Sequence, residues 1–459
     1  MGTTEKVARF ITQFEFQAIP TKGVEQIKAS MIDAIGTALL ACNGPVGTTM
    51  MSFLKEMGGN PQARLIGSGM KTSVLNAALA NGALIHTLDY DDGGGFGHVG
   101  AVLTPPALVL GEYSRLSGKR ILEAYAVGFE IGTKLRQSMG EVQTEAGFHS
   151  TSLFGALCAA AESAKLLGLD VTQTRMALGM AASFASGIMQ NFGTYTKPLH
   201  AGHAAQSGVM AAMLARMGLT ADPDILEGPR GFFYVFGQTQ SVIKHMTENI
   251  GKPLAIAEHD MHFKPWPCCG GNHEALTAML RMVKQHDIKP DQVESIEVAT
   301  SWKPPGPVTR TDPQNGYQGK FSLQYTMATA ILDRQVVLDS FTDEKFSRPM
   351  LQNLIKKVKL FWHPDCAGRP LRLQSEGRFV VVTLKLNDGR VLSERQDSGT
   401  KKNLKGEEVY TKYRENAKIA GLGDSDIEHS VTLIKKLEDL EDMTELMDTV
   451  TRCRLSSTE

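Results

Sequence analysis

The chain has 459 residues, of which 42 % are hydrophobic and 21 % charged, a composition typical of a folded globular protein and not of a disordered one. Its 48 Lys and Arg residues almost cancel its 49 Asp and Glu residues, so no positive field is available to attract a nucleic acid. No segment reaches the roughly 18 uninterrupted apolar residues of a membrane helix, so neither nucleic acid nor membrane is expected as a partner.

The N-terminal segment and the cysteines indicate the compartment. Residues 1–16 mix charged and apolar side chains and lack the basic, apolar and small-residue order of a signal peptide. Six cysteines at irregular positions are too few for a disulfide scaffold and form no Cys-x-x-Cys zinc motif. A cytoplasmic location is therefore expected.

From residue 1 to about residue 250, apolar side chains recur every three or four positions between Gly, Pro and Asn residues. This spacing predicts successive helices packed into a helical core. The expected helices are Val24–Ala41, Ser73–Leu88, Ile121–Arg136, Ser152–Leu167, Thr172–Met189 and Ala204–Met217.

The pattern changes after Trp266-Pro267. Residues 293–300 alternate as a strand, and two alternating runs, 378–386 and 390–396, flank the turn Asn387-Asp388-Gly389, which predicts a hairpin. Helices are expected at 272–285 and 321–332, and again near the C-terminus at 427–436 and 443–451.

These patterns predict an α+β protein of two domains. A large all-helical domain is expected from both chain ends, residues 1–266 and 405–459, with a smaller α/β domain of antiparallel strands, residues 267–404, inserted between them. Two chain crossings between such domains suggest a lid hinged on a helical base, with the ligand in the cleft.

The first cluster of polar side chains follows one of the expected helices and contains His86, Asp89, Asp91, Asp92 and His98. Its glycines match the Gly-x-Gly-x-x-Gly spacing at 95–100, but a dinucleotide loop needs a preceding strand and no acidic neighbours. One interpretation is a flexible turn that brings His98 into a cleft with a carboxylate orienting a histidine. A solvated acidic helix end is the alternative.

The same cluster has a metal interpretation, since His86, Asp89, Asp91 and His98 all carry ligand atoms for a divalent ion. The spacing matches no metal motif and no second ligand cluster is evident in the sequence. No metal is therefore expected.

Two further clusters precede or open helices. His149 stands just before an apolar helix that Ser150 or Thr151 could cap, a place that favours the neutral imidazole of a proton acceptor, although a structural histidine fits equally. Lys197 lies between Thr196, an expected cap, and Pro198, where a helix start favours an anion. A solvated lysine is the alternative.

His200 and His203 follow Lys197 at a spacing of three, which places them on one helical face. A fourth cluster lies at the expected domain junction, where Phe263-Lys264-Pro265-Trp266-Pro267 leads to the adjacent Cys268 and Cys269 and then to His273 at the start of a helix. Adjacent cysteines bridge only with strain, so buried thiols are expected there.

Taken in order, these motifs resemble the MmgE/PrpD family. The resemblance rests on the segments around His86–His98, on Gly147-Phe148-His149, Thr196–Gly202, Glu227–Phe232, Phe263–Cys268 and Lys320–Tyr325, and on a closing helix from Lys435. It implies a helical domain with an inserted α+β lid, a homodimer, and a cofactor-free lyase site for a small di- or tricarboxylate.

The resemblance also implies roles for individual residues. Lys197 and His273 would stabilise carboxylate and enolate charge, His98 and His149 would transfer protons, and Asp89 would orient a histidine. Substrate contacts are expected from Lys197, His200, His203, Asp91 and Tyr325. Dehydration, decarboxylation and epimerisation share a carbanion-like step, so an epimerase remains an alternative, as does a non-catalytic polycarboxylate-binding protein.

Overall fold

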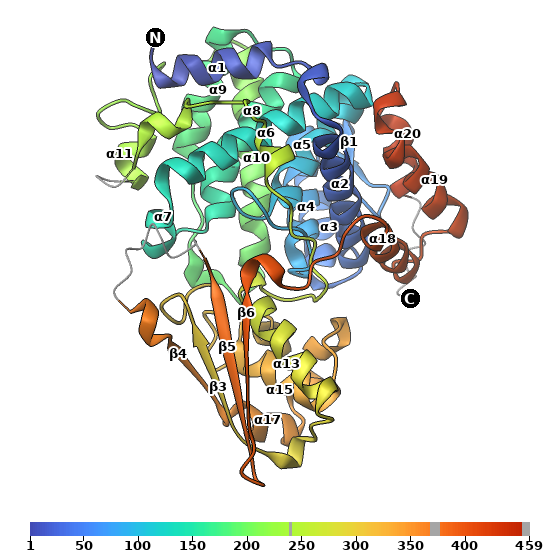
Figure 1. The fold of residues 1–459 in the computed structure, drawn as a ribbon. Coiled ribbons are helices and arrows are strands. Elements are labelled where there is room, and N and C mark those ends of the chain that lie inside the picture. The colour runs from blue at the N-terminus through green and yellow to red at the C-terminus, as the bar shows by residue number, and fades with distance from the viewer. Residues whose placement is uncertain (238–240, 368–376, 452–459) are drawn as a thin grey trace. The chain divides into compact units, whose positions relative to one another are not determined.

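The computed structural model describes residues 1–237, 241–367 and 377–451 (Figure 1). The chain divides into two compact units. The larger contains Met1–Met189, Lys197–Phe263 and Leu404–Glu459, and the smaller contains Gln190–Thr196 and Lys264–Asn403. The expected boundaries, 266/267 and 404/405, lie within three residues of these, but the sequence did not indicate that Gln190–Thr196 joins the smaller unit.

The larger unit is helical apart from a short ribbon of β1 (Ala63–Arg64) and β2 (Lys71–Thr72), which corrects the expectation of an all-helical domain. Its helices are α1 (Thr3–Gln13), α2 (Thr21–Ala41), α3 (Pro45–Met57), α4 (Val74–Thr87), α5 (Val99–Ser114), α6 (Gly118–Met139), α7 (Val142–Glu145), α8 (Ser150–Leu166), α9 (Val171–Phe184), α10 (Thr196–Arg216), α11 (Phe232–Gly237), α12 (Ala255–Glu258), α18 (Glu407–Ile419), α19 (Asp424–Lys435) and α20 (Thr444–Val450).

Helix α5 is the longest of the elements that the sequence did not predict. It holds Pro105 and Pro106 in its interior, a pair that usually ends a helix. The helix is buried from Val99 to Glu112 and packs against α4 and α8, so burial of its apolar residues outweighs the local cost of the prolines.

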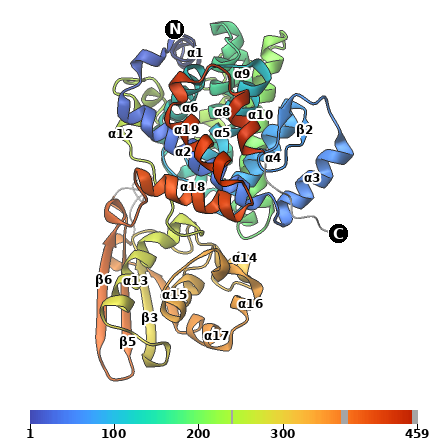
Figure 2. The same ribbon diagram turned by 90° about the vertical axis from the view of Figure 1, so that its right-hand side faces the viewer.

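The C-terminal helices pack on the N-terminal ones, and α18 lies along α2 (Figure 2). The Lys412 ammonium of α18 is buried and lies 2.7 Å from Asp33 of α2, and it also donates to the carbonyl of Tyr90 at 2.5 Å. The C-terminal segment is thereby tied to the polypeptide that follows α4.

The smaller unit contains a four-stranded sheet with the order β4-β3-β5-β6. The predicted hairpin is confirmed, with Gly389 in its turn at φ +89°. Strand β4 pairs with β3 in parallel, so the sheet is mixed and the expectation of antiparallel strands alone was incomplete. The strands are β3 (Val293–Thr300), β4 (Val358–Trp362), β5 (Phe379–Leu386) and β6 (Val391–Asp397).

Helices of the smaller unit pack on this sheet, with α13 against β5 and β6 and α15 against β4. The helices are α13 (His273–Gln285), α14 (Gly316–Gly319), α15 (Leu323–Asp333), α16 (Asp343–Phe346) and α17 (Pro349–Ile355). An α+β fold is thus confirmed, and the strands predicted at 293–300 and 378–396 lie in this unit and not in the helical core.

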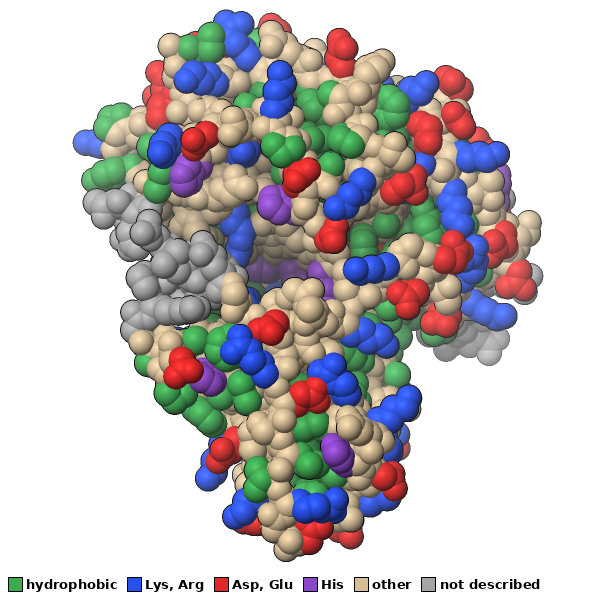
Figure 3. Space-filling model, viewed as in Figure 1, with side chains coloured by type: hydrophobic (Ala, Val, Ile, Leu, Met, Phe, Trp, Pro, Cys, Tyr) green, Lys and Arg blue, Asp and Glu red, His purple; other side chains and the backbone are tan. Residues whose placement is uncertain are grey.

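The surface charge, the helices and the cysteines agree with what the composition indicated. Acidic and basic side chains are intermixed over the face shown in Figure 3. Across the described ranges, none of the helices has both the length and the apolar character that a bilayer crossing requires. Five cysteines are free and buried, while Cys453 lies outside the described residues.

Two glycines let α4 and α10 cross with their backbones in contact. A Cβ atom at Gly202 would lie 2.1 Å from the carbonyl oxygen of Leu79, and one at Gly82 would lie 2.7 Å from the Cα of Gly202. His86 follows Gly82 by about one helical turn and Lys197 precedes Gly202 by little more than one. The close crossing therefore sets the separation of these two polar side chains.

Replacing Gly202 with alanine should push α4 and α10 apart, because the added methyl group meets a backbone carbonyl that cannot rotate away. We expect a lower melting temperature and a decrease of about 1–3 kcal/mol in the free energy of unfolding. Gly399→Ala is the matched control, since a Cβ atom there has no neighbour within 4 Å. Equal stability of the two variants would contradict the close crossing.

Candidate active site

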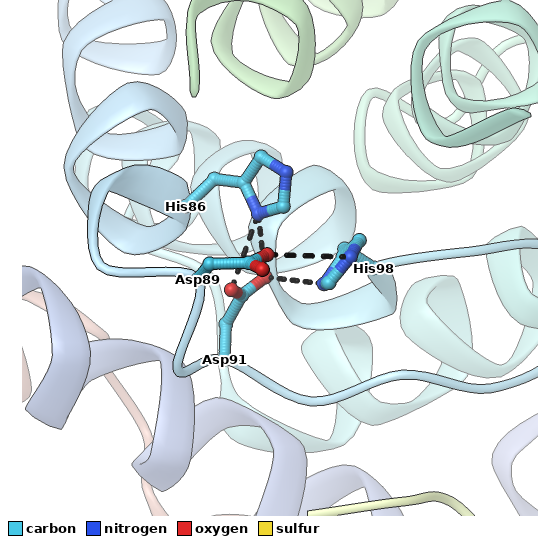
Figure 4. Close-up of side chains that lie close together, drawn as sticks. All are labelled: His86, Asp89, Asp91 and His98. Carbon is cyan, nitrogen blue, oxygen red and sulfur yellow. Dashed lines mark hydrogen bonds and ion pairs between the residues drawn. The ribbon is translucent and has the colours of Figure 1, made fainter. Parts of the chain in front are cut away.

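A buried cluster of histidines and carboxylates lies where α4 ends (Figure 4). His86 is in the last turn of α4, Asp89 follows with φ +50°, and His98 is the residue before α5 begins. Between them the chain doubles back, with mutual backbone hydrogen bonds between Gly94 and Gly97. This turn brings side chains twelve residues apart in the sequence into one cluster.

Asp91 is at the centre of the cluster and is fully buried. Its carboxylate lies 3.0 Å from Nδ1 of His86 and 3.0 Å from Nδ1 of His98. Burial opposes ionisation, but the ring N–H groups of the two histidines hold the pKa of Asp91 well below its usual range. An ionised Asp91 accepts from Nδ1 of His86, and Nδ1 of His98 lies between Asp91 and the backbone carbonyl of Asp92, which is 2.9 Å away, so each ring presents Nε2 on its other side.

Lys197, the second residue of α10, enters the cluster from the other helix. Its ammonium lies 2.7 Å from Nε2 of His86 and 2.9 Å from Oδ1 of Asp89, and its side chain is only 2 % exposed. Burial and the adjacent ammonium lower the pKa of His86 to about 3, so this ring is neutral and accepts from Lys197. Lys197 is therefore not a solvated surface lysine, which was the alternative interpretation.

His98 is the more accessible histidine, with 18 % of its side chain exposed. Its Nε2 lies 3.8 Å from Oδ1 of Asp89, and its backbone N–H donates to Thr151 at the start of α8. Thr151 is therefore engaged with His98, and α8 begins at Ser150 without a side-chain cap. The expectation that Ser150 or Thr151 caps this helix was wrong.

The cluster also has the donor set of a divalent metal site, since ligand atoms of His86, Asp89, Asp91 and His98 all lie within 4.8 Å of one another. The Lys197 ammonium already contacts two of these four residues. A second cation there would be repelled by the ammonium, which supplies the positive charge that the carboxylates require. The arrangement thus fits an ammonium-centred site better than a metal centre.

Asp92 points to the opposite side from Asp91. It accepts from Ser30 of α2 and from the backbone N–H of Gly100 at 2.8 Å, and Ser30 lies 2.5 Å from the Tyr125 hydroxyl. Burial and the neighbouring charge of Asp33 raise the pKa of Asp92 to about 7. The carboxylate of Asp92 therefore anchors the turn to α2 and α5, while its backbone carbonyl lies 2.9 Å from Nδ1 of His98.

His149 precedes α8 and lies beside the cluster, with its ring centroid 5.8 Å from that of His86 and 6.4 Å from that of His98. Its Nδ1 is 3.2 Å from Nδ1 of His200. Burial, followed by the charge of Lys197 and the neighbouring histidines, holds the pKa of His149 well below its usual value. Burial and these charges, and not the helix terminus, therefore favour the neutral imidazole that the sequence predicted.

Three further residues that were expected to contact the substrate, His200, His203 and Asp91, differ in burial and in their partners. His200 is buried and held against His149, whereas His203 is exposed on α10. Asp91 contacts the two histidines at Nδ1, whereas Asp89 lies 2.9 Å from the Lys197 ammonium and 3.8 Å from Nε2 of His98, so Asp91 is the carboxylate placed to orient the rings, and its contact with the substrate stays a prediction.

Two expected site residues belong to the smaller unit. His273 is buried at the start of α13, where its Nε2 lies 3.2 Å from the carbonyl of Cys268 and its ring packs on Trp266. Tyr325 is buried between Phe341 and Phe346 and donates its hydroxyl to the carbonyl of Ser340. The expectation that Tyr325 donates to the substrate is corrected, because its hydroxyl is engaged within the core of that unit.

No central role was predicted for His86, although it was named among the residues of the first cluster. The signal was available, since His86-x-x-Asp89-x-Asp91 places a histidine in the last helical turn and two carboxylates just after it. Ser30, which donates to Asp92, and Tyr125, which contacts Ser30, carry no such signal, because they come from helices distant in the sequence.

Comparison with known proteins gives matches along almost the whole chain. Residues 5–244 match the family model described as the MmgE/PrpD N-terminal domain, and residues 266–436 match the MmgE/PrpD C-terminal domain. The first match falls in the larger unit apart from Gln190–Thr196, and the second falls in the smaller unit apart from its extension into the C-terminal helices.

Curated relatives are similar over their full length. The chain is 29 % identical to a cis-aconitate decarboxylase of Mus musculus and 29 % identical to one of Homo sapiens, each alignment covering 96 % of this chain and 92 % of the relative. It is 25 % identical to a cis-aconitate decarboxylase of Aspergillus terreus over 97 % of this chain and 95 % of that protein.

The raised pKa of Asp92 predicts how stability depends on pH. Between pH 4 and pH 7 the unfolded chain has lost this proton while the folded protein retains it, so Asp92 destabilises the fold increasingly as the pH rises through this window. Asp92→Asn removes the buried charge but keeps an acceptor for Gly100. The variant should match the wild type near pH 4 and exceed it by up to about 4 kcal/mol at pH 8.

Denaturant unfolding of both proteins at several pH values measures this difference directly. A stability difference that does not change between pH 4 and pH 8 would show that Asp92 has no raised pKa in the folded protein.

Proposed function

The chain belongs to the MmgE/PrpD family and is a lyase, and from this premise we propose that it decarboxylates a small tricarboxylate of the cis-aconitate type, without metal or organic cofactor. The observation that carries this proposal is the Lys197 ammonium, buried among His86, Asp89 and the other cluster residues. The decarboxylase names of relatives aligned over more than nine-tenths of this chain support the reaction type.

Lys197 is suited to stabilising charge on the substrate. An ammonium in a site shielded from water interacts far more strongly with a carboxylate or an enolate-like carbanion than the same group does at a surface. Because Asp91 is ionised and holds both histidines by Nδ1, the rings keep fixed orientations while the substrate charge changes. The site therefore needs little reorganisation during the reaction.

The chemical step requires one bond to break and one to form. The carbon–carbon bond to the departing carboxylate breaks and carbon dioxide leaves, while the electron pair passes to carbon next to a remaining carboxylate or along an adjacent double bond. A proton then forms a new carbon–hydrogen bond, so each turnover consumes one proton.

His98 and His149 are the groups that we assign to this proton transfer. Nδ1 of His98 lies beside Asp91, so Nε2 is on the other side of this partly exposed ring. Nδ1 of His149 contacts Nδ1 of His200, and burial favours the neutral ring. We therefore assign proton exchange to the other ring nitrogen, Nε2. We assign charge stabilisation by His273 to the same reaction, as the family resemblance implies.

The reaction is tested by incubating the purified, chelator-treated protein with cis-aconitate, citrate, methylcitrate and iminodisuccinate and recording product masses. We expect a loss of 44 Da, the mass of carbon dioxide, with one of the tricarboxylates and unchanged turnover after chelation. Loss of water would identify a dehydratase, an unchanged mass with altered chirality an epimerase, and binding without turnover a polycarboxylate-binding protein.

Lys197→Met keeps the length and bulk of the side chain but removes its charge. Turnover should fall by about 10²- to 10³-fold, since removing a charge-stabilising group from a site of this kind typically costs that much. The variant should also be less stable, because Asp89 then remains buried without its 2.9 Å cation. Rates are therefore compared per folded molecule, and near wild-type turnover would exclude Lys197 from the chemistry.

A further inference from the structure

The contact between His149 and His200 joins two ring nitrogens of the same kind. Nδ1 of His149 lies 3.2 Å from Nδ1 of His200, and the two ring centroids are 5.4 Å apart. Both rings are buried, and a further hydrogen bond from the Ser152 hydroxyl to the carbonyl of His200 fixes that residue against α8. The position of His200 relative to His149 is thus set by two independent contacts.

A hydrogen bond between two Nδ1 atoms allows only one proton between them. When His200 carries that proton, His149 accepts at Nδ1 and holds its own proton on Nε2, so it is an acid. When His149 carries the proton, its Nε2 has a lone pair and it is a base. The tautomer of His200 therefore determines whether His149 can give or take a proton at Nε2.

The surroundings disfavour a charged intermediate in this pair. His149 faces Lys197, His86 and His98, and His200 faces Lys197 and His203. Burial and these groups lower the pKa of His200 to about 4, so neither ring takes up a whole extra proton at low cost near neutral pH. A shift of protons along the pair leaves both rings neutral and avoids this cost.

The proposed reaction also requires a proton supply for His149. His200 lies on α10, and His203, three residues further along the same helix, is exposed. The decarboxylation proposed above consumes one proton per turnover, and a buried His149 that has given up its proton must regain one. In one concerted step His149 gives up its Nε2 proton and takes the Nδ1 proton of His200, while Nε2 of His200 takes up a proton, so both rings stay neutral with their tautomers exchanged. The reverse shift after product release, with a proton entering at Nε2 of His149 and one leaving Nε2 of His200, restores the starting state.

We propose that His200 is a positioning residue for His149, which sets the His149 tautomer through the Nδ1–Nδ1 hydrogen bond and gives it a proton there when His149 acts as an acid. This role replaces the substrate contact that the sequence suggested for His200. The proton supply rests on the proposed function, whereas the control of the tautomer does not require any substrate.

The tautomers are measured by nitrogen NMR of the protein labelled with ¹⁵N-histidine, without substrate. We expect His149 and His200 to be neutral at pH 7 with opposite protonation at Nδ1. His149→Gln and His200→Phe assign the two sets of signals, and the His149 tautomer should change in His200→Phe. Two rings that both carry their proton on Nε2 in the wild type would overturn the proposed hydrogen bond.

Kinetics separate this role from a substrate contact. His200→Asn retains a donor and an acceptor near the Nδ1 position but cannot pass a proton, so kcat should fall roughly tenfold to a hundredfold while KM stays within a few-fold. His286→Gln, which removes an exposed histidine of the smaller unit, is the matched control and should leave both parameters unchanged.

Three kinetic results would overturn the proposal. A wild-type kcat in His200→Asn would show that no proton passes through His200. A higher KM with unchanged kcat would make His200 a substrate contact, and equal losses in the variant and in His286→Gln would mean that the effect is not specific. Absence of any decarboxylation by the wild type would remove the proposed reaction, while the NMR spectra would still decide whether His200 sets the tautomer.

Discussion

The arrangement of the site depends on the burial of one ionised carboxylate, Asp91. A charge that is removed from water must be met by hydrogen-bond donors, and Asp91 obtains these from Nδ1 of His86 and of His98. Each ring is thereby held in one tautomer with Nε2 on its other side. Lys197 can then donate to His86, and His98 can present Nε2 from its half-buried position.

Adjacent carboxylates in this turn have opposite electrostatic environments. Asp91 faces two histidine N–H groups and has a lowered pKa, whereas Asp92 faces Ser30 and the field of Asp33 and has a raised one. Because successive side chains leave the turn in different directions, one carboxylate serves the site and the next fastens the turn to α2. The C-terminal helix α18 supports the same turn through Lys412 and the carbonyl of Tyr90.

Local patterns were sufficient for most of the fold. The spacing of apolar residues predicted the principal helices, and strand β3 was predicted at its observed bounds because its alternation is regular. The Asn387-Asp388-Gly389 turn fixed the hairpin since glycine accepts the positive φ found there. Helix α5 was not predicted, because Pro105 and Pro106 oppose it locally and only its burial between α4 and α8 outweighs them.

For the site, the sequence by itself determined the candidate groups: the His86–His98 cluster, His149, Lys197 and His200 all stand out as polar residues beside helix ends. The tertiary structure decided their partners, because contacts such as Lys197 with Asp89 and His149 with His200 join residues 108 and 51 positions apart. It also removed Tyr325 from the substrate contacts, since the carbonyl of Ser340 takes its hydroxyl. Residue type limits which charges and protons a chain can offer, but tautomers, pKa values and hydrogen-bond partners depend on burial and distance, which arise only when the helices pack.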